Sequence, residues 1–140
     1  MSLRAGQIIL LLVALAPVTG MTENAVALPD NYCSWEVKDY AIEEPLCGLE
    51  GDALRGKQIV SDSHLGNCLA CHYIEGGESP GTIAPPLVAM SSRYPDKAAL
   101  RAQIWDATVA NPESSMPPFG RHGILSEEEI DKVVEFIWAL

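Results

Sequence analysis

Basic residues are scarce in this 140-residue sequence. Nine lysines and arginines stand against nineteen aspartates and glutamates, which gives a formal net charge of −10. A chain this acidic is a poor partner for nucleic acid or for an anionic lipid surface, because both carry negative charge of their own. The charge fits either simple solubility or a docking face for a basic partner.

Long apolar runs are also lacking, since the apolar stretch at residues 8–16 is too short to span a bilayer. Arg4 precedes this stretch and small residues follow it, which is typical of an exported protein. The pattern predicts a signal peptide over residues 1–20. A second candidate cleavage site follows residue 27. An uncleaved membrane anchor is the alternative, and the polar residues that follow argue against it. We expect a periplasmic protein in an oxidising compartment, with no membrane contact after cleavage.

Only four cysteines are present, and two of them belong to the most informative motif. Residues 68–72 have the pattern C-x-x-C-H, which is the attachment signature of c-type haem. Residues three apart lie on the same side of a short helical turn, so both thiols can form thioethers with one porphyrin. The next residue, His72, then supplies the proximal iron ligand. The motif predicts one covalently bound haem c per chain, on Cys68 and Cys71.

Two other uses of a C-x-x-C pair fit this sequence less well. A zinc site needs a second ligand pair, and the remaining cysteines, Cys33 and Cys47, lie upstream. A thioredoxin-like redox motif follows a strand, and none is indicated before Cys68. Two cysteines remain once the haem motif is assigned, and the protein is expected to be exported. Together these observations predict a disulfide between Cys33 and Cys47. A free thiol or a bond to a partner chain is the alternative.

A methionine in a proline-rich loop is the candidate for the second axial ligand. Met116 is followed by two prolines, which restrict the loop, and its thioether is a soft ligand that favours reduced iron. A lone methionine usually fills a core, but the position of Met116 in such a loop, after the haem motif, favours ligation. His122 is the rival ligand if the loop moves.

The proline-rich residues 83–87 are expected to orient His72. A ligating histidine usually gives its other ring N–H to a carbonyl or carboxylate, which fixes the tautomer. The stiff backbone near Pro85 offers such a carbonyl. Arg93 has two equally supported interpretations, contact with a haem propionate or simple solvation.

Helical periodicity predicts three helices. The first covers residues 53–60 after an N-cap at Asp52, and its Gly56 fits a close helix crossing under Phe136 or Trp138. The second covers residues 96–110, with one buried face. The third follows a capping box that begins at Ser126.

This succession of helices, haem motif, proline loop and methionine loop resembles class I cytochrome c over about residues 51–140, after an N-terminal extension at residues 28–50. Within that group it is similar to the SoxX family, the monohaem subunits of SoxAX cytochromes. The combination of Gly-Thr-x-Ala-Pro, Ser-Arg-aromatic and Asn-Pro-x-x-x-Met-Pro-Pro carries this resemblance, since the haem motif alone is unspecific. The matching residues are 51–52, 55–56, 66–72, 81–85, 92–94, 100–101, 104, 106 and 111–118.

The resemblance implies an all-α, class I cytochrome c-like single domain around one covalent haem. It implies a SoxA-type dihaem or monohaem partner, in a complex that joins thiosulfate to a cysteine of a SoxY-type carrier protein, an L-cysteine S-thiosulfotransferase. This subunit is expected to accept the released electrons and pass them to a small soluble cytochrome c. We expect no catalytic residue in this chain, because no nucleophile has a base beside it.

Two other functions stay open. The chain can be a free-standing periplasmic electron carrier, which co-purification of a second haem protein would distinguish from a subunit. A ligand-sensing cytochrome with an open sixth site is the third interpretation, and Met116 argues against it.

Overall fold

The structure, a computed structural model, describes residues 35–140. These residues form helices and connecting loops, with one isolated bridge between Lys38 and Ala41, which confirms the predicted all-α class. No helix in this part of the chain has the length and apolar character needed to cross a membrane. The helices are η1 (Leu46–Gly48), α1 (Ala53–Ser61), η2 (Cys68–Ala70), α2 (Met90–Arg93), α3 (Lys97–Trp105), α4 (Ala107–Ala110) and α5 (Glu127–Trp138).

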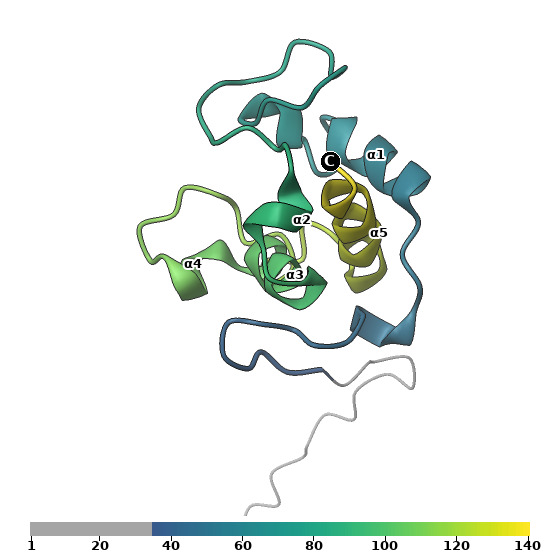
Figure 1. The fold of residues 1–140 in the computed structure, drawn as a ribbon, viewed down its shortest axis with the longest axis vertical. Helices are drawn as coiled ribbons and strands as arrows, with labels where there is room; N and C mark the ends of the chain where they lie inside the picture. The colour runs from purple at the N-terminus through teal and green to yellow at the C-terminus, as the bar shows by residue number, and fades with distance from the viewer. Residues whose placement is uncertain (1–34) are drawn as a thin grey trace, which may run out of the picture.

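Helices α1 and α5 lie side by side (Figure 1) and form the most extensive helix contact of the described residues. A Cβ atom on Gly56 would lie 2.0 Å from the carbonyl oxygen of Lys132 and 3.0 Å from the Cβ of Phe136. Only glycine lets the two backbones approach this closely. The predicted close crossing at Gly56 is therefore confirmed, with Phe136 as the side chain packed over it.

The predicted starts of α1 and α5 are also confirmed. The Asp52 carboxylate accepts hydrogen bonds from two backbone N–H groups of the first turn of α1. Ser126 and Glu129 form a reciprocal capping box at the start of α5. The apolar stripe of α5 is buried against the core; it consists of Ile130, Val133, Val134 and Ile137.

The single helix predicted over residues 96–110 is wrong, because the chain breaks it at Asp106. This residue has an extended backbone, with φ −156° and ψ 94°, between α3 and α4. Its carboxylate accepts hydrogen bonds from the backbone N–H of Thr108 at 3.0 Å and from the Thr108 hydroxyl at 2.5 Å. A short acidic side chain that caps a new helix competes with continuation of the old one. Two elements therefore replace one.

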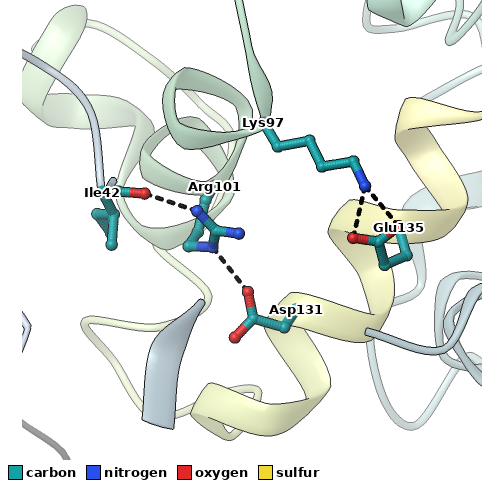
Figure 2. A network of polar contacts seen from close by, with 5 residues as sticks. All are labelled: Ile42, Lys97, Arg101, Asp131 and Glu135. Atoms are coloured by element: carbon teal, nitrogen blue, oxygen red, sulfur yellow. Dashed lines mark hydrogen bonds and ion pairs between the residues drawn. The ribbon is translucent and has the colours of Figure 1, made fainter. Parts of the chain in front are cut away.

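The segment before α1 packs into the same core as the helices. Ile42 and Leu46 are 1 % and 0 % exposed. Figure 2 shows Arg101 of α3 between this segment and α5, donating to the carbonyl oxygen of Ile42 at 2.6 Å and to the Asp131 carboxylate at 2.7 Å. Burial raises the pKa of Asp131, and the Arg101 guanidinium opposes that rise. The network joins three parts of the chain that are distant in sequence.

Candidate haem site

Both thiols of the C-x-x-C-H motif lie on one short helical turn. Cys68 begins η2 and Cys71 directly follows it, with the backbone N–H groups of Cys71 and His72 donating to the Cys68 carbonyl oxygen at 3.2 Å and 2.9 Å. The turn is joined to α1 because the Gly66 N–H donates to the Ile59 carbonyl oxygen at 3.1 Å. Both thiols are free and partly buried. This is the helical turn that attachment of one porphyrin requires.

The environment of Cys68 argues against a redox dithiol. Burial raises the pKa of the Cys68 thiol to about 11. Dithiol oxidoreductases do the opposite and lower the pKa of the attacking cysteine, since the thiolate is the nucleophile. A neutral, partly buried thiol fits a structural thioether better. Nor does any cluster of three or more His, Cys, Asp or Glu side chains within residues 35–140 offer a site for a metal such as zinc.

The His72 imidazole is oriented by the proline loop, as predicted. Its Nδ1 lies 2.7 Å from the carbonyl oxygen of Pro85. A carbonyl oxygen can only accept, so Nδ1 carries the proton and donates it. Nε2 is then the nitrogen with a free lone pair, which is the state a histidine needs to bind a metal.

The proline loop is fixed to the motif on both sides of this bond. The backbone N–H groups of Ala84 and Leu87 donate to the carbonyl oxygens of Cys71 and Tyr73 at 3.0 Å and 2.8 Å. These two acceptors are the neighbours of His72 in the chain. The carbonyl that orients the imidazole is therefore held in register with it.

Arg93, at the end of α2, also contacts this loop. Its Nη1 donates to the Pro86 carbonyl oxygen at 2.6 Å and lies 3.3 Å from the Sδ of Met90. The interpretation of Arg93 as a merely solvated side chain is therefore wrong, although the side chain is exposed. Contact with a propionate stays a prediction.

Met116 lies in the loop after α4, half-buried against the core. Its backbone N–H donates to the Ser114 hydroxyl at 3.2 Å, and the Gln103 side-chain amide lies 3.8 Å from its sulfur. Sequence patterns did not single out Gln103, because only the fold brings α3 to this loop. His122 is exposed on the following turn.

The features of the site lie on two loops outside the α1–α5 pair. In Figure 1 the teal loop after η2 lies at the top of the view and the light green loop after α4 lies at its left, both extending away from α5. The donors they and η2 contribute are two thiols, an imidazole with a free Nε2 and a thioether. This donor set fits a c-type haem, whose iron takes histidine and methionine as axial ligands.

The predicted disulfide concerns the N-terminal side of the structure. Cys33 lies outside the described residues. Cys47, in η1, is not among the free thiols. The Cys33–Cys47 pairing stays a prediction, as do the signal peptide over residues 1–20 and the sixth-ligand role of Met116.

Comparisons with known proteins agree with this geometry. A family model described as cytochrome c matches residues 53–140. An uncharacterized lipoprotein of Aquifex aeolicus (strain VF5) is 33% identical over 104 residues, which are 72% of this chain and 50% of that protein. The chain thus spans about half the length of this relative. A chain in the crystal structure of SoxXA from P. pantotrophus is similar with a TM-score of 0.68 and 31% identity, covering 74% of this chain and 92% of that one.

Proposed function

Since the chain belongs to the cytochrome c family and has an electron-transfer role, we propose that it is the haem-carrying subunit of a SoxAX-type complex. The observation that carries the proposal is the likeness, in sequence and in fold, to a chain of SoxXA. The oriented His72 beside two thiols supports the cofactor assignment.

In this proposal each site residue has one task. Cys68 and Cys71 would hold one haem c covalently, and His72 and Met116 would bind its iron. The haem would supply one-electron redox chemistry. The Pro85 carbonyl keeps the His72 proton on Nδ1 and raises the basicity of Nε2. The thioether of Met116 favours the reduced state.

The reaction served by the complex is the oxidative joining of thiosulfate to a cysteine of a SoxY-type carrier protein. A sulfur–sulfur bond forms, the cysteine thiol loses its proton, and two electrons leave. Bond formation takes place on the SoxA-type partner subunit. This chain takes up the electrons one at a time and passes them to a small soluble cytochrome c, so it needs no proton-transfer group of its own.

The proposed location is the periplasm, reached by means of the signal peptide at residues 1–20. Two arguments support it. Haem c is attached outside the cytoplasm in bacteria, and the Aquifex relative is named a lipoprotein.

Affinity purification from the native periplasm tests the proposal. A tagged chain should elute with a second protein that stains for covalent haem, in constant ratio across a gel-filtration peak. An untagged strain processed in parallel is the control. Thiosulfate and the carrier protein together should then reduce the haem of the complex, whereas neither alone should do so. Elution of the chain alone, as a monomer, would favour the free-standing electron carrier instead.

A further inference from the structure

We infer that Arg93 is a positioning residue for the axial histidine, His72. It acts through Pro85 and Pro86. The Pro85 carbonyl oxygen accepts a hydrogen bond from His72, and the Pro86 carbonyl oxygen accepts one from Arg93. The inference rests on the proposed function, because it takes His72 as the iron ligand.

Two adjacent carbonyl groups accept hydrogen bonds from two different side chains. His72 Nδ1 donates to the Pro85 oxygen at 2.7 Å, and Arg93 Nη1 donates to the Pro86 oxygen at 2.6 Å. Proline has no backbone N–H, so this pair of residues cannot be held by amide donors of its own. The carbonyl oxygens are their only backbone groups for hydrogen bonding, and both are used.

Arg93 joins this segment to a fixed part of the core. Met90, which begins α2, is 2 % exposed, and its backbone N–H donates to the Leu140 carbonyl oxygen at 3.2 Å. The Met90 sulfur lies 3.3 Å from the Arg93 guanidinium. Helix α2 contacts α5. The contact of Arg93 with Pro86 therefore fixes the proline segment relative to the α5 end of the core.

Among the described residues, no protein carboxylate forms an ion pair with Arg93. Instead, the Nη1 group of its guanidinium contacts both a carbonyl oxygen and a thioether sulfur. A guanidinium is planar and more rigid than a lysine ammonium on its flexible stem, so it holds such a contact with less loss of conformational freedom. Loss of the guanidinium should free the Pro86 carbonyl and loosen the neighbouring Pro85 carbonyl against His72.

Nuclear magnetic resonance of the reduced, haem-loaded protein tests this directly. The readout is the rate at which the His72 Nδ1 proton exchanges with water. Arg93→Gln should raise this rate by about tenfold, the size expected from a lost hydrogen bond to a charged group. Arg93→Lys should give an intermediate rate. This variant keeps the positive charge, so a change in its reduction potential reports on the hydrogen bond of His72. The potential should rise, because a less firmly bonded imidazole is a weaker donor to ferric iron.

Arg55→Gln is the matched control, since Arg55 is another exposed arginine and donates to Gln58 on α1. It should leave the exchange rate unchanged. The inference is overturned if the exchange rate in Arg93→Gln stays within about twofold of wild type, because a twofold change corresponds to less free energy than one hydrogen bond contributes. It is also overturned if Arg55→Gln changes the rate equally. A wild-type protein without covalent haem would overturn the proposed function itself. Normal haem loading with unaltered exchange would overturn the role of Arg93 alone.

Discussion

The sulfur of Met116 is the side-chain atom on which the proposed redox role depends most. Met116→Ala should remove the weak far-red sulfur-to-iron band of the ferric protein and let the reduced protein bind carbon monoxide. It should also lower the reduction potential, because a soft axial ligand favours ferrous iron. Optical titration against redox mediators, with and without carbon monoxide, measures all three effects.

His122→Ala is the control for that experiment, because His122 is exposed on the turn that follows Met116. It should leave the spectrum and the potential unchanged. Loss of low-spin character in His122→Ala, together with its retention in Met116→Ala, would show that the sixth ligand is misassigned. A haem with two histidine ligands would have a lower potential and would accept electrons less readily.

Asp106 predicts a pH dependence of stability. Hydrogen bonds from Thr108 and then from Arg121 hold the pKa of its buried carboxyl below the usual 3.8. A lowered folded-state pKa stabilises the protein above the unfolded-state pKa, and this contribution is lost as the pH falls through the folded-state pKa. Asparagine can still cap α4, but Asp106→Asn removes the charge that pairs with Arg121. It should therefore cost about 0.5–1 kcal/mol of unfolding free energy at pH 7, the size of a partly exposed ion pair.

The cost of Asp106→Asn should shrink in acid, because the wild-type carboxyl is then protonated as well. Urea titrations at pH 7 and at a pH below the lowered folded-state pKa of Asp106 measure the difference. An equal cost at both values would contradict the assignment of a charged carboxylate to this site. Glu113→Gln, at an exposed position of the next loop, is a suitable control for the general effect of removing a negative charge.

The crossing of α1 and α5 gives a prediction for a single methyl group. Gly56→Ala improves helix propensity by about 1 kcal/mol, but its Cβ would lie 2.0 Å from the Lys132 carbonyl oxygen. Forcing apart packed elements costs about 1–3 kcal/mol, occasionally more. We expect a net loss of stability in chemical denaturation, whereas Lys57→Ala, at an exposed position of the same helix, should be nearly neutral. A more stable Gly56→Ala variant would contradict the crossing.

The helices could be predicted where local chemistry decides them. Asp52 and Ser126 are capping residues that need no tertiary partner, and both begin helices as predicted. The glycine at position 56 indicated a close approach because it is costly in a helix without one. The hydrogen-bond acceptor of His72 could be predicted because Pro85 and Pro86 have no backbone N–H, so their only backbone hydrogen-bonding groups are carbonyl oxygens.

The features that could not be predicted depend on contacts between distant parts of the chain. Asp106 has helical neighbours on both sides, and its bond to Arg121 across the following loop favours the break. Ile42 and Leu46 lie in a turn-rich segment without helical periodicity, so their burial follows only from the fold. The contact of Gln103 with Met116 joins α3 to a loop beyond α4.

The described segment before α1 and the helices form a common core, and Cys47, one of the two cysteines of the predicted disulfide, lies in that segment. Leu46 is fully buried, and Cys47 follows it in η1. A Cys33–Cys47 bond would close a loop in the segment that Arg101 anchors, and would stabilise the fold by roughly 3 kcal/mol in the chain-entropy model. Non-reducing peptide mapping of the exported protein should recover the two cysteines as one linked peptide pair. Two free thiols in the native protein would rule the bond out.

The described core is small for a chain that must also enclose a cofactor. Binding that occurs only in the folded state stabilises that state. We therefore expect the chain made without cytochrome c maturation to stay largely unfolded, and the loaded chain to fold cooperatively. In the proposed function, covalent attachment of haem is therefore required for folding, and only the folded chain can bind a partner.

The most direct measurement is the mass of the chain after acid-acetone extraction, following expression with a cytochrome c maturation system. The account predicts a mass increase of one haem, located by peptide mapping to Cys68 and Cys71, and no covalent haem when both cysteines are replaced by alanine. A chain that loses its haem on extraction, or that never acquires one, would contradict the claim that this protein is a c-type electron carrier.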